Sequence, residues 1–411
     1  MELGKAIQFN PSERIAKGKL AKKIPMEKLT AFEKKIKGFE YAEYSASPKF
    51  RNGDTLVAKI TPCLENGKTA QVDILENNEV AFGSSEFIVL RQNESSINDF
   101  IFYLAKSPAF RKRAIGCMEG TSGRKRVNEG ALKLQVLPFP DKTTQQKIAT
   151  VLSSLDSKIE LNNRINSELE AMAKILYDYW FVQFDFPDTN GKPYKTSGGK
   201  MIWNKELKRE IPEGWEVQHL SNIANITTGK LDSNAEVIGA KYPFYTCASE
   251  PSATDNFAFD DTVILIAGNN ASGNFHINRY KGKFNAYQRT YIVTSKKPIE
   301  LEYLYQVLKT ETISLKSQGK GSQTKFLTIG MLTYIKTFVN TGLMEQYNRI
   351  VNPMYEQQVI IRSQNQQLSS LRDWLLPMLM NGQVKVGDSM DNKASYEIGE
   401  EMRMAAEPGK N

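Results

Sequence analysis

Two long amphipathic segments stand out in the pattern of apolar and polar positions along the chain. From Ile148 to Trp180, apolar or amide side chains recur at spacings of four and three residues, the heptad seam of a helix that packs against another helix. The same spacing recurs from Tyr347 to Leu379, each position 199 residues after its counterpart. The seams include Leu152, Leu155, Ile159, Asn166, Leu169 and Leu176 in the first segment and Met354, Ile361, Asn365, Leu368 and Leu375 in the second.

These seams predict one helical design used twice. Both carry an asparagine at the same phase, Asn166 and Asn365, and a buried seam asparagine fixes the register of paired helices. A helix of about 36 residues at roughly 1.5 Å per residue is about 54 Å long, which is enough to separate two domains. Pro353 and Pro377 lack the N–H donor, so each is expected to kink or end the second helix.

The sequence upstream of each helix also repeats. Asp54–Val57 parallels Asp261–Ile264 at an offset of 207, and both read as a turn followed by a strand. A repeat of about 200 residues indicates a domain duplication, because solenoid units have about 20 to 50 residues. Closer to the helices the offset is 200, and the matched positions are Ser122, Lys125, Val127, Gly130 and Leu132 with Ser322, Lys325, Leu327, Gly330 and Leu332.

The expected organisation therefore alternates globular domains with helices. The helical period breaks at Asp185–Pro193, a run rich in Pro, Gly and Asn. We expect domains at 1–141 and 187–341, helices at 142–186 and 342–386, and a disordered tail at 387–411 that lacks apolar periodicity.

Composition narrows the class of protein. The 411 residues include 40% hydrophobic and 24% charged ones, and no apolar run reaches the length of a membrane span. Three scattered cysteines and an N-terminus without an apolar signal core favour the cytoplasm. Only two histidines, His219 and His276, are present, so we expect no metal site. The net charge of +8 favours a polyanionic partner.

No complete catalytic motif is present, so we expect no enzymatic activity and no catalytic residue in this chain. Gly268–Gly273 follows an apolar run, but Asn274 and Phe275 stand where a phosphate-binding loop needs Lys and Ser or Thr. No amino-methyltransferase motif appears, and no Gly-rich cofactor loop opens a βαβ unit.

Several segments carry a family resemblance over about residues 1 to 385. They are Tyr179–Pro187, Gly191–Lys195, Ile211–Val217, Leu371–Pro377 and Gly382–Gln383. In these segments the chain resembles the specificity subunits of type I restriction-modification systems.

The resemblance implies a mixed α+β and α/β fold with two target-recognition domains in a pseudo-two-fold tandem duplication, separated by two long antiparallel coiled-coil helices. It implies double-stranded DNA as the ligand, two modification subunits that methylate adenine, and two ATP-dependent restriction subunits. S-adenosylmethionine, ATP and Mg are then expected on the partner subunits, and no cofactor on this chain.

Two loops of small residues and cations lie at equivalent places, at 120–126 and 319–325. Such loops can approach phosphates while their cations neutralise charge. A solvated basic turn is the alternative for either loop alone. The candidate residues are Ser122, Arg124, Lys125 and Arg126 in the first loop and Lys320, Ser322, Gln323 and Lys325 in the second.

Base readers are expected in the loops that differ between the halves, because Asn and Gln can pair with adenine edges and Arg and Lys with guanine edges. Surface asparagines also mark turns, and Gln288-Arg289 could form a strand edge without contacting DNA. The candidates are Lys59, Asn66 and Lys68 in the first half and Asn269, Asn270, Asn274, Gln288 and Arg289 in the second.

Two other classes of protein compete with the DNA-reading subunit. One is a coiled-coil scaffold whose basic loops bind protein or RNA, and the other is a self-contained nuclease or methyltransferase. A duplicated frame with divergent loops argues against both.

Overall fold

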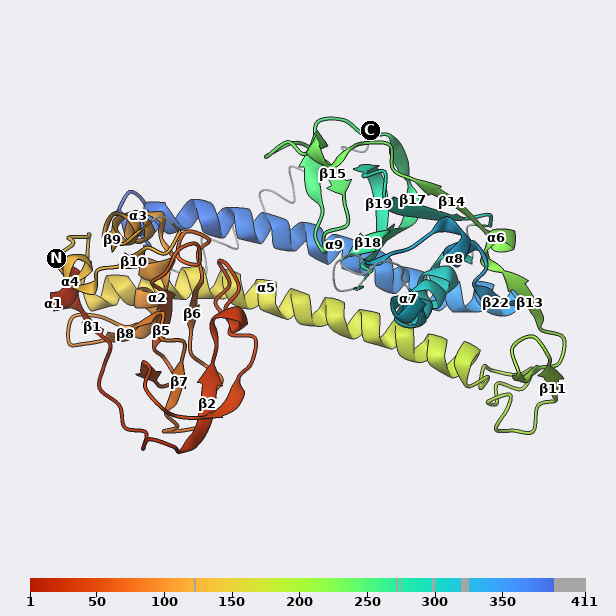
Figure 1. Cartoon of the computed structure of the whole chain (residues 1–411), viewed down its shortest axis with the longest axis horizontal. Helices are drawn as coiled ribbons and strands as arrows, with labels where there is room; N and C mark the ends of the chain where they lie inside the picture. Colours follow the sequence, from red (N-terminus) through yellow and green to blue (C-terminus); the bar gives the residue numbers. More distant parts are fainter. Residues whose placement is uncertain (122, 271–272, 274, 298–299, 319–324, 388–411) are drawn as a thin grey trace, which may run out of the picture. The chain divides into compact units, whose positions relative to one another are not determined.

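The heptad segments form two helices of 36 and 40 residues, α5 (Lys142–Tyr177) and α9 (Thr341–Met380). The computed structural model describes residues 1–121, 123–270, 273, 275–297, 300–318 and 325–387. The chain divides into unit 1, Met1–Asn162 with Ser363–Asn411, and unit 2, Asn163–Arg362. Each unit therefore contains part of α5, yellow in Figure 1, and part of α9, blue. Of the tail predicted at 387–411, residues 388–411 lie outside the described residues.

Unit 1 contains two four-stranded sheets. The first has the order β1 (Ile7–Phe9), β8 (Phe87–Gln92), β5 (Thr55–Ala58) and β6 (Thr69–Gln71). The second has the order β3 (Glu40–Glu43), β2 (Leu20–Ile24), β7 (Ala81–Gly83) and β4 (Lys49–Phe50). The shorter elements of unit 1 are α1 (Leu3–Ala6), η1 (Met26–Lys28), α2 (Asn98–Lys106), α3 (Pro108–Gly116), the pair β9 (Met118–Glu119) and β10 (Arg126–Val127), and α4 (Glu129–Lys133).

Unit 2 is built on one six-stranded sheet. Its order is β14 (Ala224–Thr228), β20 (Thr290–Ser295), β17 (Phe259–Ala267), β19 (Ile277–Ala286), β15 (Tyr242–Tyr245) and β16 (Ser252–Thr254). Helix α7 (Leu301–Gln318) contacts β17, β19 and β20. Three strand pairs accompany the sheet: β11 (Met201–Asn204) with β12 (Arg209–Pro212), β13 (Glu216–His219) with β22 (Lys336–Val339), and β18 (Asn269–Asn270) with β21 (Lys325–Phe326). The shorter helical elements are η2 (Asp178–Val182), α6 (Leu220–Ile223), η3 (Ser233–Ala235) and α8 (Ile329–Thr333).

The two units share a core of four strands, since β1-β8-β5-β6 corresponds to β14-β20-β17-β19. In unit 1, Ala58 pairs with Phe87, and in unit 2, Ala267 pairs with Thr290. This correspondence confirms the predicted duplication of a mixed α/β domain. It also corrects the alignment of the central strands, because Ala58 matches Ala267 at an offset of 209 rather than 207.

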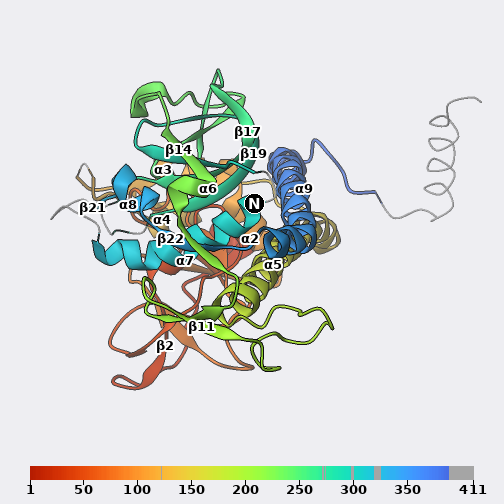
Figure 2. The ribbon, with the colours of Figure 1, turned by 90° about the vertical axis from the view of Figure 1, so that its right-hand side faces the viewer.

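Within each unit the two helices run antiparallel. In unit 1, Arg372 Nη1 donates to Asp156 Oδ1 (2.8 Å) and Asn162 Nδ2 donates to Asn365 Oδ1 (2.8 Å). In unit 2, Gln358 Nε2 donates to the carbonyl of Asn166 (3.4 Å) and Tyr347 Oη to that of Ala173 (3.0 Å). As the residue number rises along α5, that of its partner on α9 falls, which defines the antiparallel direction. Figure 2 shows both helices nearly end-on.

The predicted seam positions are all buried or partly buried. The two predicted asparagines differ in their surroundings, because Asn365 accepts from Asn162, whereas Oδ1 of Asn166 has no hydrogen-bond partner in the described part of the chain. Helix α9 continues through Pro353 and Pro377, so neither proline ends it. Arg349, whose carbonyl loses its donor at Pro353, is exposed, and water can supply the missing hydrogen bond.

Aromatic side chains at the end of α5 belong to the core of unit 2. Tyr177, Trp180 and Phe181 are buried there, with the ring of Phe181 at 4.6 Å from that of Tyr303 between centroids. None of the helices formed by described residues is long and apolar enough to cross a membrane.

Candidate nucleic-acid interface

In unit 1, three separate segments of the chain meet where the central strand β5 ends. The backbone N–H of Lys59 donates to the carbonyl of Glu86 (2.9 Å), and the carbonyl of Lys59 accepts from the N–H of Val127 (2.8 Å). Nearby, Thr61 N donates to Lys125 O (3.0 Å) and Lys125 N donates to Thr61 Oγ1 (3.1 Å). We call Lys59–Thr61, Glu86 and Lys125–Arg126 the unit 1 junction.

Unit 2 contains the same arrangement at the end of β17. The N–H of Gly268 donates to the carbonyl of Arg289 (2.8 Å), and the carbonyl of Gly268 accepts from Leu327 N (2.8 Å). Strand β18 then pairs with β21, so that Asn269 lies opposite Phe326. We call Gly268–Asn270, Arg289 and Lys325–Phe326 the unit 2 junction.

Both junctions are held together largely by main-chain hydrogen bonds. A backbone ladder of this kind places the Cα atoms whatever the side chains are, because every residue except proline carries the same N–H and C=O groups. Glu86 of the unit 1 junction thus corresponds to Arg289, and Arg126 corresponds to Phe326. The frame is constant while its side chains differ.

The side chains of the unit 1 junction form two ion pairs. Arg126 Nε donates to Glu86 Oε1 and Oε2 (3.0 and 2.9 Å), and Arg126 Nη2 donates to Oε1 (2.8 Å). These hydrogen bonds lower the pKa of the Glu86 carboxyl below its ordinary value, so it is ionised at neutral pH. Lys59 Nζ lies 3.4 Å from Glu129 Oε1, and Arg124 and Lys125 are exposed.

The structure brings only some of the predicted residues together. Lys59, Lys125 and Arg126 meet in the unit 1 junction, whereas Asn66 is exposed in the turn that follows it and Lys68 Nζ donates to the carbonyl of Met26 (3.1 Å). Asn269, Asn270, Arg289 and Lys325 meet in the unit 2 junction, with Gln288 exposed beside them. Ser122, Asn274, Lys320, Ser322 and Gln323 lie outside the described residues.

Comparison with known proteins identifies the family. A family described as "Type I restriction modification DNA specificity domain" matches residues 23–171 and 212–337. These ranges are more than half of the chain. The chain belongs to this family.

Individual relatives carry the same description. The type I restriction enzyme EcoDI specificity subunit of Escherichia coli is 32% identical over 195 residues, which cover 46% of this chain and 43% of that protein. The HindI specificity subunit of Haemophilus influenzae is 25% identical over 411 residues, covering 82% of this chain and 88% of that protein. The S subunit of M. genitalium has an 18% identical sequence and the same fold, with a TM-score of 0.56 over 92% of this chain and 95% of that one.

This specificity subunit thus has two structurally matched junctions, and Glu86 is a junction residue that sequence reasoning missed. An acid directly before an apolar strand has no characteristic spacing, and its neighbours Lys59 and Arg126 are distant in sequence. The sequence difference at this position becomes visible only after β8 is aligned with β20. This alignment makes Glu86 equivalent to Arg289.

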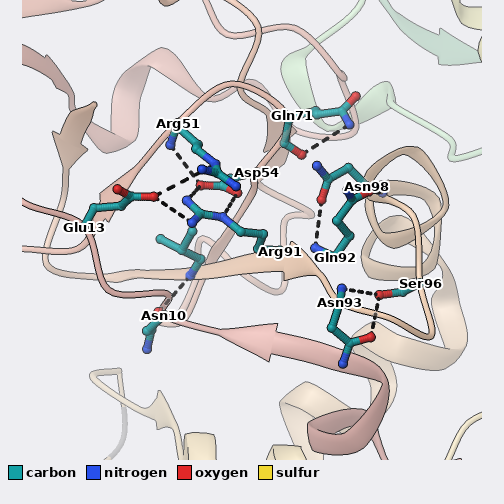
Figure 3. A network of polar contacts seen from close by, with 12 residues as sticks. Asn10, Glu13, Arg51, Asp54, Gln71, Arg91, Gln92, Asn93, Ser96 and Asn98 are labelled. Carbon is teal, nitrogen blue, oxygen red and sulfur yellow. Dashed lines mark hydrogen bonds and ion pairs between the residues drawn. The ribbon is translucent and has the colours of Figure 1, made fainter. Parts of the chain in front are cut away.

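A second polar cluster of the specificity subunit, shown in Figure 3, is structural. Arg91 Nε and Nη2 donate to the two carboxylate oxygens of Asp54 (both 2.6 Å), and Arg91 Nη1 donates to Glu13 Oε1 (2.6 Å). Arg91 and Asp54 are buried, with 7% and 1% exposed. Both edges of this guanidinium are occupied, so it has little capacity left for a ligand.

Proposed function

We propose that this DNA specificity subunit reads a split, asymmetric target, with unit 1 contacting one half-site and unit 2 the other. One observation carries the proposal: the two junctions share a backbone frame but present different side chains, Glu86 and Arg126 in one and Arg289 and Phe326 in the other. Phosphate contacts by exposed cations such as Lys125 would fix the register, and side chains of the junctions and adjacent loops would read base edges.

We propose further that two modification subunits bind the long helices. Each helix carries, besides its seam, a second row of exposed apolar side chains at heptad-like spacing, an arrangement that a partner helix covers. Three pairs of positions are equivalent at the offset of 199: Leu161 and Ile360, Met172 and Leu371, and Ile175 and Trp374, exposed by 50% and 51%, 52% and 44%, and 66% and 55%. Two equivalent rows fit two copies of one partner.

In this proposal the chain selects DNA and other subunits perform the chemistry. Adenine methylation with S-adenosylmethionine belongs to the modification subunits, and ATP- and Mg-dependent cleavage to two restriction subunits, in a cytoplasmic complex. The specificity subunit itself contributes neither a cofactor site nor a catalytic residue.

The test combines the purified chain with the modification subunit of its own system and S-adenosylmethionine. The chain alone should transfer no methyl group, and the mixture should methylate DNA at one split motif. Methyl transfer by the chain alone, or RNA bound more tightly than the DNA motif, would contradict the proposal.

A further inference from the structure

We propose that Arg126 reads a guanine in the half-site of unit 1 and that Glu86 is the positioning residue that orients its guanidinium for this contact. The proposal rests on the proposed function and goes beyond it by assigning one base and one pair of residues.

The hydrogen bonds of Arg126 leave one edge of its guanidinium available. The Glu86 carboxylate occupies the side-on edge, made by Nε and Nη2. The end-on edge, made by Nη1 and the second hydrogen of Nη2, has no hydrogen-bond partner among the described residues. Two parallel N–H donors match the O6 and N7 acceptors that guanine presents in the major groove.

Exposure distinguishes this arginine from structural ones in the same unit. The Arg126 side chain is 51% exposed and its partner Glu86 is 22% exposed. The side chains of Arg91 and Arg372, taken alone, are 9% and 12% exposed, and each uses both Nε and Nη1 for bonds to carboxylates. Arg126 thus presents its donors to solvent, where a base edge could reach them.

Orientation by Glu86 reduces the conformational entropy that the Arg126 side chain loses when it binds a base. A free arginine side chain loses conformational entropy when it docks on a base, whereas one held through its side-on edge has lost part of that freedom already. The carboxylate also stays charged at neutral pH, because Arg126 lowers its pKa. It therefore acts as an acceptor for the guanidinium and cannot itself donate to the base.

Unit 2 supplies an internal comparison. At the two equivalent positions it has Arg289 and Phe326, which cannot form this pair, and Phe326 is 38% exposed. Changes to Glu86 or Arg126 should therefore alter the reading of one half-site and leave the other unchanged.

The experiment uses the chain in complex with its modification subunit, on duplexes carrying the motif that the complex methylates. Each guanine of the motif is replaced in turn by 7-deazaguanine, which lacks N7, or its base pair is changed to A·T, and affinity is measured by titration. In the wild-type complex, one guanine of one half-site should be sensitive to both changes, by about 10- to 100-fold for the base-pair change. Arg126→Met, which removes every guanidinium donor, and Glu86→Gln should largely remove this sensitivity, and Glu86→Asp should retain part of it.

Matched variants distinguish a loss of base recognition from a general effect of charge and from a loss of folding. Lys125→Ala should weaken binding to all DNA evenly and lower the salt dependence by about one phosphate contact. Glu86→Gln, which removes a negative charge, should not weaken binding to unrelated DNA. Lys158→Ala, on an exposed face of α5, should change neither the discrimination at the guanine nor the affinity for unrelated DNA. Thermal melting of each variant checks its folding.

Full wild-type discrimination in both Glu86→Gln and Arg126→Met would overturn the proposal, as would an equal loss at both half-sites. If Arg126→Met does not fold, the wild-type result with 7-deazaguanine still tests the contact, because insensitivity at every guanine would exclude it. A wild-type complex that prefers no DNA sequence would instead refute the proposed function.

Discussion

Lys106 on α2 and Lys309 on α7 are equivalent at an offset of 203, the offset that also relates Glu86 to Arg289. Their ammonium groups differ in surroundings. Lys309 Nζ lies 2.6 Å from Glu170 Oε1. Lys106 is 6% exposed, and its Nζ has no hydrogen-bond partner in the part of the chain that the structure describes. The residue equivalent to Glu170 on α9 is Ser369, which carries no charge. Burial therefore lowers the pKa of Lys106 to about 8.

This lysine should make stability depend on pH. Below pH 8 the Lys106 side chain is charged in both the folded and the unfolded state, and the folded state bears the full free-energy cost of burying the charge. Between pH 8 and about 10.5 the unfolded state binds more protons, so stability rises with pH. Lys106→Met should increase the free energy of unfolding at pH 7 by about 3 kcal/mol. The gain should disappear near pH 10.5, as measured by urea denaturation at both pH values.

Lys309→Met provides the matched control. It should destabilise the fold, since it removes the partner of Glu170. A Lys106→Met chain that is less stable than wild type at pH 7 would contradict the assignment.

At the scale of elements, each long helix has two apolar faces with different roles. The seam packs within each unit, whereas the row containing Met172 and Ile175 on α5, and Leu371 and Trp374 on α9, is exposed. Replacing Met172 and Ile175 by Asp should remove one bound modification subunit, because a charge in a helix interface is costly to desolvate. Replacing Leu371 and Trp374 by Asp should remove the other. Sedimentation of the reconstituted complex measures the stoichiometry.

Arg164→Asp, on an exposed position of α5, serves as the control and should leave the stoichiometry unchanged. Two bound modification subunits in both double variants would show that the exposed apolar rows of α5 and α9 are not the docking faces.

For the whole molecule, both helices pass from one unit to the other, α5 at Asn162 and Asn163 and α9 at Arg362 and Ser363. Inserting one heptad at both points keeps the pairings within each unit, such as Asn162 with Asn365. Seven residues add roughly 10 Å of helix, equivalent to about three base pairs. We expect the gap between the half-sites to lengthen by about that number while both half-sites stay the same.

Mapping of methylated motifs in cells expressing the variant measures the gap. An insertion in α9 alone should disrupt the helix pairing and serves as the control. Exchange of residues 187–341 for another recognition domain should change one half-site and keep the gap. An active double-insertion variant with an altered half-site and an unchanged gap would refute this spacing model.

The sequence predicted the features that depend on local periodicity. The heptad spacing predicts α5 and α9, because a helical face repeats every 3.6 residues whatever lies opposite it. The offset of 199 between Asn166 and Asn365 indicates duplication without any knowledge of contacts. The seam alone did not determine which residues pair, and the asparagine that donates to Asn365 is Asn162 and not its equivalent, Asn166.

Tertiary structure decided the strand alignment and the make-up of the junctions. A slip of two residues keeps every side chain on the same face of a strand, so the apolar pattern could not distinguish an offset of 207 from 209. Lys59, Glu86 and Arg126 meet only through strand pairing and loop closure across long stretches of chain. The sequence by itself therefore determined a duplicated frame with divergent loops, whereas long-range pairing decided which charged groups face each other, because local periodicity carries no information about contacts between distant segments.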